Sequence, residues 1–451
     1  MKGTMSAPRV ASRYLLLGLL LITLFGAYLR VNAALHTTVL YPLRADAGQY
    51  FSYAFNLRHF GVYSHEPKFA APADGIAPRP DALRPPGYPL LLTLFAGEVS
   101  AAKTILHITL LQAVLGILMI PLVYLIGREL LPDPWPLLPA LLVAISPQLV
   151  ISGTYVLSET WFAFLMLLSI AGMIAQFRKP ERAGYAVLAG VLVGLAALTR
   201  PTLQYFVPMV LIGMLPLLPA GTRLRQAVAM SAGFAIAFAP WIARNLLTLG
   251  TSSDPTLMIS SLVHGHYPGL MYEGRAESLG YPYRFDPRIG EISASVASVL
   301  GEIGRRFAAE PGTYLHWYLV GKPLSFLSWG DAAAAGDIFT YPTPQSPYHG
   351  APFFQLTKAA MQSTHWLWVG LALAGTALVA LPRIRRTLDG ASRTALQLLV
   401  LIMAYFVAIH MVGFPIARYN IPLLPVIYLL SAYVIVHLAS TYGHKHSMTA
   451  S

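Results

Sequence analysis

The first residues with clear chemical potential lie in the polar stretch 43–54, which contains Asp46, Tyr50 and Tyr53. If Asp46 begins a helix, its carboxylate is expected to cap the amides of the first turn. Tyr50 and Tyr53 then follow at i+4 and i+7, on the same helix face. Two interpretations stay open from this spacing. The stretch either places a reactive carboxylate beside two phenols, or it is a capped helix start with interfacial tyrosines.

A second polar stretch, Leu-Arg-Pro-Pro-Gly-Tyr-Pro-Leu-Leu-Leu, occupies residues 83–92. Its two prolines stiffen the chain, and Gly87 permits a tight turn. Arg84 comes just before an apolar run, where a guanidinium can hold a phosphate with two hydrogen bonds. The alternative is an ordinary arginine whose head group reaches the membrane surface.

Further charged residues stand where long apolar segments end. They are Glu159 in Ser-Glu-Thr, Arg200 in Thr-Arg-Pro, Arg244 in Arg-Asn and Arg418 in Arg-Tyr-Asn. Charges at membrane depth are costly and often mark functional sites. The pattern predicts that these four side chains converge on one cavity. Each of them alone is also compatible with a helix-end anchor.

The composition indicates a membrane protein rather than a soluble one. Of 451 residues, 56% are hydrophobic and 11% are charged, whereas a soluble protein carries roughly 25% charged residues. Disordered chains are rich in charge, so disorder is excluded as well. The absence of cysteine rules out disulfides, thiolate catalysis and cysteine-ligated metals. The net charge of +12 then favours contact with anionic lipids and phosphates over nucleic acid.

Hydropathy predicts an all-α polytopic membrane protein that forms a single domain over residues 1–451, with about ten spans. The asymmetry of Lys and Arg in the short loops places both termini in the cytoplasm. Two long segments, 35–103 and 245–363, then face outward, with short helices expected at 84–95 and 292–307. The predicted spans are 14–34, 104–127, 135–151, 158–177, 185–199, 203–218, 224–243, 364–381, 395–412 and 422–438.

The order of these motifs resembles that of the GT-C class of membrane glycosyltransferases. The motifs run from Asp46…Tyr50 and Arg84-Pro-Pro-Gly-Tyr-Pro to Pro240-Trp…Arg-Asn and Arg418-Tyr…Pro. They are most similar to those of bacterial relatives of the protein O-mannosyltransferases and of the lipid A aminoarabinose transferase. The resemblance implies a GT-C-like fold and a sugar donor carried on polyprenyl phosphate. The mannosyltransferases carry Asp-Glu in the first loop, whereas Ala47 follows Asp46 here.

The resemblance also implies roles for individual residues. Asp46 takes the position of the catalytic base, and Arg84 and Arg418 match residues that contact the donor phosphate. We expect Arg200 and Arg244 to assist them in phosphate binding. The expected substrate-contacting residues are Tyr50, Tyr88, Glu159, His264 and Tyr267.

No cofactor is expected. The chain lacks a P-loop and a dinucleotide-binding glycine pattern. The first loop contains no Asp-x-Asp, and His264-Gly-His266 has no acidic partner at a useful spacing, so a metal site is not expected.

These features predict an inverting glycosyltransferase in the cytoplasmic membrane, with its active site facing outward. Its partners would be a polyprenyl phosphate-linked hexose or pentose, membrane lipids and an acceptor glycan, lipid or protein. Two alternatives stay open. One is a transporter or flippase of a lipid-linked sugar, although the inverted repeats and broken helices typical of transporters are not evident. The other is a non-catalytic assembly subunit of the same fold.

Overall fold

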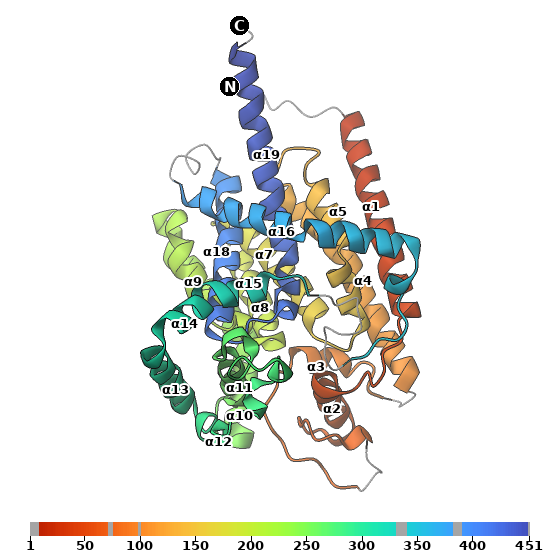
Figure 1. Ribbon diagram of the computed structural model, residues 1–451. Helices are drawn as coiled ribbons and strands as arrows, with labels where there is room; N and C mark the ends of the chain where they lie inside the picture. The colour runs from red at the N-terminus through yellow and green to blue at the C-terminus, as the bar shows by residue number, and fades with distance from the viewer. Residues whose placement is uncertain (1–8, 71–74, 98–100, 331–340, 382–389, 450–451) are drawn as a thin grey trace.

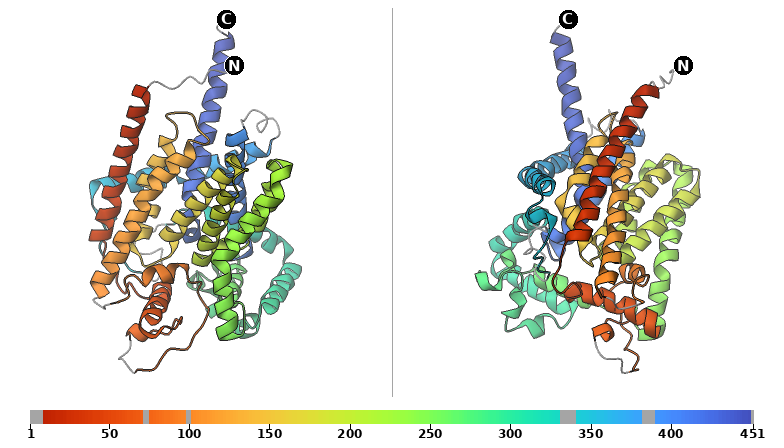
Figure 2. Two further views of the ribbon diagram at one scale, coloured as in Figure 1. Left: turned by 180° about the vertical axis from the view of Figure 1, so that it is seen from behind. Right: turned by 90° about the vertical axis from the view of Figure 1, so that its right-hand side faces the viewer.

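A computed structural model describes residues 9–70, 75–97, 101–330, 341–381 and 390–449. The described parts contain no β-strand and only one isolated bridge, between Thr38 and Gln345. Figures 1 and 2 show the two termini at one end of a helical bundle. The short helices α2, α3 and α11 to α14 lie at the other end. The predicted all-α fold is confirmed.

The long helices form the bundle, and the shorter ones fill the segments between them. The helices are α1 (Arg9–His36), α2 (Ala45–Phe60), α3 (Gly87–Leu92), α4 (Ala101–Gly127), α5 (Leu137–Ile145), α6 (Pro147–Ile151), α7 (Glu159–Arg178), α8 (Ala183–Thr199), α9 (Phe206–Gly213), α10 (Ala220–Leu249), α11 (Thr256–Gly265), α12 (Ile289–Ile292), α13 (Val296–Ala309), α14 (Pro311–His316), α15 (Lys322–Leu327), α16 (Pro352–Ala380), α18 (Gly390–Val412) and α19 (Leu424–Thr449). The 3-10 segment η10 (Ala417–Leu423) precedes α19.

Within the described residues, seven helices are long and apolar enough to cross a membrane, and the bent pair of α5 and α6 makes an eighth candidate. Helix α8 and the segment that contains α9 are apolar but shorter. Figure 1 shows α16 running across the other long helices rather than beside them. The chain is therefore a multi-pass membrane protein, while the count of ten spans stays a prediction.

Helices α8 and α10 approach each other closely through glycines. Gly190 and Gly194 form a small-xxx-small pair on α8. A Cβ atom on Gly190 would lie 2.1 Å from the carbonyl oxygen of Met230, and one on Gly233 would lie 2.1 Å from that of Val187. Small residues allow such contact between membrane helices, where dispersion forces rather than hydrophobic burial drive association.

The hinge between α5 and α6 is stabilised by a buried arginine. Pro147 has no N–H to donate to the carbonyl of Val143, so that group loses its helical partner. Arg30 of α1, which is only 2% exposed, provides the missing donor. Its Nη2 donates to the carbonyl of Val143 at 2.7 Å, and its Nη1 donates to the carbonyl of Ala144 at 2.9 Å. The two helices bend by 56° at this point. The segment 135–151, predicted as one continuous span, is thus two helices that meet at a sharp bend.

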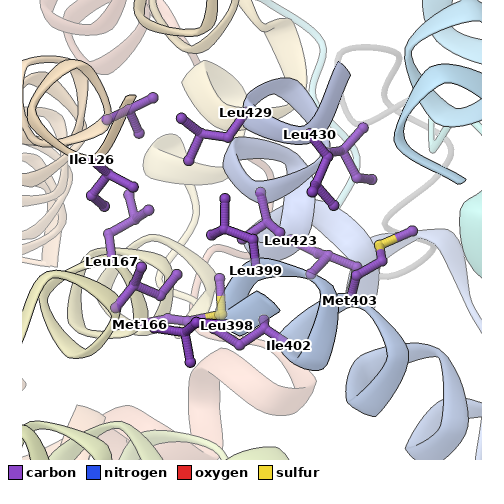
Figure 3. Close-up of a cluster of buried hydrophobic side chains, with 14 of the residues drawn as sticks. Ile126, Met166, Leu167, Leu398, Leu399, Ile402, Met403, Leu423, Leu429 and Leu430 are labelled. Atoms are coloured by element: carbon purple, nitrogen blue, oxygen red, sulfur yellow. The ribbon is translucent and has the colours of Figure 1, made fainter. Parts of the chain in front are cut away.

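The largest apolar core lies between α4, α7, α18 and α19. Figure 3 shows Leu167 of α7, Leu399 of α18 and Leu429 of α19 pointing toward one another within it. The core includes Phe162 near the start of α7, which carries Glu159, and Ile421 and Leu423 of η10, which carries Arg418.

Three predictions about local structure need correction. The short helix expected at 84–95 covers only Gly87–Leu92, and the one expected at 292–307 begins at Val296 and continues to Ala309. Helix α2 begins at Ala45, and the Asp46 carboxylate does not cap it. That carboxylate bonds instead to arginines from distant parts of the chain.

Candidate active site

Five charged residues from five separate places in the sequence meet beside the first turn of α2. They are Asp46 of α2, Arg84 just before α3, Glu159 at the start of α7, Arg200 just after α8 and Arg418 of η10. All five were predicted from the sequence. The structure places them in one connected network.

Arg84 binds α2 through two neighbouring side chains. Its Nη2 lies 2.7 Å from Oδ1 of Asp46, and its Nε and Nη2 donate to Oε1 of Gln49 at 2.9 and 2.7 Å. The guanidinium carbon also lies 5.2 Å from the centre of the Tyr50 ring. Sequence analysis missed Gln49, although its position three residues after Asp46 places it on the same helix face.

Arg418 joins the two carboxylates of the network. Its Nη1 lies 3.1 Å from Oδ2 of Asp46, and its Nε lies 2.6 Å from Oε1 of Glu159. Arg200 approaches the same Glu159 oxygen at 2.9 Å. The Arg200 guanidinium also covers the Tyr419 ring at 4.9 Å. Both oxygens of Asp46 are therefore engaged by arginines in the structure.

Exposure separates the two acids of the network. The side chain of Glu159 is 1% exposed, whereas that of Asp46 is 32% exposed. Glu159 is therefore a buried counter-ion, and Asp46 is the acid that a substrate can reach. Three arginines against two carboxylates leave the network with one net positive charge. A buried net charge is costly unless it is paired, so this site favours an anionic ligand.

The arginines also control the protonation of Asp46. Burial by itself would raise the pKa of this carboxyl, but the positive charges of Arg84 and Arg418 outweigh that effect. Together they lower the pKa of Asp46 from 3.8 to about 2. The carboxylate is consequently ionised at neutral pH and able to accept a proton.

Arg244 lies in a second cluster, which supports the backbone around Arg84. Its Nη1 donates to the carbonyl of Asp81 at 2.7 Å and its Nη2 to that of Tyr63 at 3.1 Å. The hydroxyl of Tyr63 donates to the Arg84 carbonyl at 3.0 Å, and the Arg84 amide donates to the Tyr53 hydroxyl at 3.2 Å. The structure thus places Arg244 in contact with the segment around Arg84 rather than with the carboxylates of the network. Its predicted part in binding the donor phosphate stays a prediction.

The predicted substrate tyrosines of the first loop line the buried side of the network. Tyr50 is near Ser158, with 3.4 Å between their hydroxyl oxygens, and its ring packs edge-on against Tyr88 at 5.1 Å. Tyr88 is fully buried and donates to Oε1 of Gln112 at 2.8 Å. Both rings support the site, but the side chain of Tyr88 faces the protein interior.

His264 and Tyr267 belong to the long segment 245–363, which was predicted to face outward. Within the described residues, neither makes a hydrogen bond or ring contact with the network around Asp46. The imidazole of His264 packs against Tyr283 and Phe414, with ring centres 4.4 and 4.9 Å away. The hydroxyl of Tyr267 donates to Oδ2 of Asp286 at 2.8 Å. Their predicted contact with substrate stays a prediction.

Metal coordination has no support in the part of the chain that the structure describes. No group there of three or more His, Cys, Asp or Glu side chains is arranged to hold a metal ion. The nitrogens of His266 are buried and lack a hydrogen-bond partner there. Its pKa is lowered to about 3, first by burial and then by the charge of Arg306.

Comparison with solved structures identifies the fold. The archaeal oligosaccharyltransferase AglB from Archaeoglobus fulgidus, in complex with an inhibitory peptide and a dolichol-phosphate, matches 96% of this chain with a TM-score of 0.53 at 17% identity. An oligosaccharyltransferase from Archaeoglobus fulgidus in the apo form matches 97% of the chain with a TM-score of 0.52 at 16% identity. The chain spans about half the length of each of these two proteins, 52% in both cases.

The chain has a GT-C fold. Residues 83–244 match the family model described as dolichyl-phosphate-mannose-protein mannosyltransferase, which covers less than half of the chain and includes Arg84, Glu159 and Arg200. ArnT from Cupriavidus metallidurans, bound to undecaprenyl phosphate, matches 95% of this chain and 79% of its own at 13% identity, but the TM-score of 0.39 is too low to support a conclusion. A search of curated proteins finds no match. The resemblance inferred from the motifs is confirmed.

Proposed function

We propose that the protein is an inverting glycosyltransferase that moves a hexose or pentose from a polyprenyl phosphate to an acceptor hydroxyl. The carrying observation is the network around Asp46, in which an accessible carboxylate is held between two arginines and one positive charge is left over. The family model over residues 83–244 and the GT-C fold support a transferase of this class.

The arginines are suited to hold the donor phosphate. A polyprenyl phosphate sugar is a phosphodiester with one negative charge, which matches the net charge of the network. When the sugar leaves, the phosphate gains a second negative charge. Arg84 and Arg418, whose side chains are mostly buried, then stabilise it electrostatically. In this proposal Arg200 keeps Glu159 ionised and so holds Arg418 in place.

Asp46 is proposed to act as the general base. It takes the proton from the acceptor hydroxyl as the acceptor oxygen bonds to the anomeric carbon of the sugar. The bond between that carbon and the phosphate oxygen breaks, and the phosphate leaves with the electron pair. A single displacement inverts the anomeric centre, and the polyprenyl phosphate and the protonated Asp46 carboxyl remain.

The location of the network supports chemistry at the outer face of the cytoplasmic membrane. α2 and α3 lie at the end of the bundle opposite both termini (Figure 1). With the termini in the cytoplasm, as the Lys and Arg distribution indicates, Asp46 faces outward. The acceptor is then a glycan, lipid or protein hydroxyl on that side.

Sugar transfer by the purified protein tests this proposal. Synthetic polyprenyl phosphate hexoses and pentoses, each with a labelled sugar, would be incubated in detergent with a membrane extract from a strain that lacks the gene. We expect a labelled product together with free polyprenyl phosphate. A flippase or a non-catalytic subunit would produce neither. Heat-inactivated protein and extract alone serve as controls, and absence of product across the donor panel would contradict the proposal.

A further inference from the structure

The turn that carries Asp46 is strained and is held by a residue from far along the sequence. Ala45 has a φ of 49°, in the left-handed region that non-glycine residues rarely adopt. Such a conformation persists only where the surroundings enforce it. Gly48 permits the tight turn, because a Cβ atom there would lie 2.6 Å from the carbonyl oxygen of Leu43.

Tyr341 supplies contacts on both sides of this strained residue. Its hydroxyl donates to the carbonyl of Arg44 at 2.8 Å and accepts from the amide of Ala47 at 3.0 Å. The amide of Ala47 is one of those that a helix start leaves without a partner. The sequence predicted that Asp46 would fill this capping role, but the tyrosine hydroxyl fills it and leaves the carboxylate free to face the arginines.

Tyr341 is itself held in place by burial and by contacts of the residues that follow it. Its side chain is 1% exposed. The adjacent Thr343 is bonded to the hydroxyl of Tyr155 at 2.8 Å. The backbone that follows pairs with the first outer segment, with the amide of Leu40 on Pro342 and that of Thr38 on Gln345. Burial raises the pKa of Tyr341, so the hydroxyl keeps the proton that it donates to Arg44.

We propose that Tyr341 is a positioning residue that holds the first turn of α2 so that Asp46 faces Arg84, Arg418 and the acceptor. The second outer segment thereby contributes directly to the catalytic geometry of the first. This inference rests on the proposed role of Asp46 as the base. The buried hydroxyl of Tyr341 acts through the backbone of α2, to which it is bonded at Arg44 and Ala47.

The test is Tyr341→Phe, which removes only the hydroxyl. Tyr155→Phe is the matched control, since it removes a buried hydroxyl of the same cluster that is bonded to Thr343. For each variant we would measure the turnover number with purified protein, donor affinity by titration, the unfolding temperature, and hydrogen exchange of the peptide that contains residues 46–50. Asp46→Asn is measured in parallel.

We expect Tyr341→Phe to lower turnover about tenfold relative to the control, because the turn that carries Asp46 loses its hydrogen bonds at Arg44 and Ala47, each of modest net strength. Donor affinity should match that of Tyr155→Phe, and exchange in residues 46–50 should rise only in Tyr341→Phe. Equal turnover in the two variants would overturn the proposal, as would equal exchange. Full activity of Asp46→Asn would instead contradict the proposed function, and the exchange data would still report whether Tyr341 holds the turn.

Discussion

At the scale of single residues, charge neutralisation explains the candidate site. Asp46 is ionised because two guanidiniums surround it, and the same guanidiniums leave the network one positive charge in excess. A phosphate that enters would share these arginines with Asp46. The carboxylate would then become a stronger base at the moment when a base is needed.

Arg84 should contribute strongly to donor affinity. Arg84→Ala removes a charged fork, and such hydrogen bonds are worth about 1.5–3 kcal/mol, so we expect donor affinity to fall roughly 10- to 100-fold. Arg84→Lys should lose less, because lysine keeps the charge but not the bidentate geometry. Arg79→Ala, an exposed residue of the same loop, is the charge-matched control. Superimposable donor titrations for all of these proteins would place the phosphate elsewhere.

The pH dependence of transfer should reflect the depressed pKa of Asp46. A pKa of about 2 keeps the base form available, so kcat/KM should show no loss attributable to Asp46 between about pH 5 and pH 7. The ion pairs of Asp46 stabilise the fold above its unfolded pKa of roughly 3.9, and this stabilisation is lost only as pH falls toward 2. With donor bound, the arginines are shared and the acid limb of kcat should lie at higher pH. If the acid limb lies at the same pH in the kcat/KM profile and in the kcat profile, that result would argue against phosphate binding by these arginines.

The sequence was sufficient to predict which charged residues belong to the site, but not which residues they contact. Asp46, Glu159 and Arg418 stand at helix starts or span ends, and such positions indicate how deep a side chain lies in the membrane. They do not indicate on which side of the bundle it lies. Arg244 has a similar depth signal but faces Asp81 and Tyr63 instead.

At the scale of elements, a close contact between the start of α3 and the end of α8 positions Arg84. Gly87 begins α3, and a Cβ atom there would lie 2.6 Å from Oγ1 of Thr199 and 2.7 Å from the Thr199 amide nitrogen. The motif with Arg84 therefore packs directly on the end of α8, next to Arg200. The sequence suggested a tight turn at Gly87, whereas the structure shows a close contact between segments.

Gly87→Ala should disturb this contact. The added methyl group meets backbone atoms that cannot move aside easily, so we expect about 1–3 kcal/mol of destabilisation and reduced transfer activity. Gly184→Ala, near the start of α8, is the control because its Cβ would meet nothing within 4 Å. Thermal unfolding in detergent would measure the difference. Equal unfolding temperatures and activities for the two variants would show that the contact at Thr199 is not tight.

Proline positions show why spans are easier to predict than their breaks. Pro121 and Pro240 lie inside the continuous helices α4 and α10, whereas Pro147 follows a sharp bend. The difference arises from tertiary contacts, because Arg30 of α1 binds the carbonyls freed at the bend. No local pattern around residue 147 indicates that partner.

At the scale of the whole molecule, the two ends of the bundle differ in structure. The termini are at one end, and the short helices α2, α3 and α11 to α14 are at the other (Figures 1 and 2). Arg178 at the end of α7 pairs with Glu129 after α4, so these connections share an end of the bundle. The alternating direction of the long helices made it possible to predict which connections share an end. The path of α16 across the other helices could not be predicted in this way.

Cysteine labelling should locate these ends relative to the membrane, since the chain has no native cysteine. Ala276→Cys lies at an exposed position in the second outer segment, and Glu181→Cys lies at an exposed position between α7 and α8. In cells with an intact cytoplasmic membrane, we expect an impermeant maleimide to label only the first. The reverse pattern would place Asp46 on the cytoplasmic side and contradict an outward-facing site.

The central claim, that Asp46 is the base in a transfer from polyprenyl phosphate, is tested most directly by the single-turnover rate of Asp46→Asn with donor already bound. The amide keeps the shape of the side chain but cannot take the acceptor proton. We predict that the rate of sugar transfer falls by about 10²–10⁴-fold relative to the wild type, while a donor titration on the same samples shows that donor is still bound. A rate within about threefold of the wild type would contradict the account, because losing a general base costs far more.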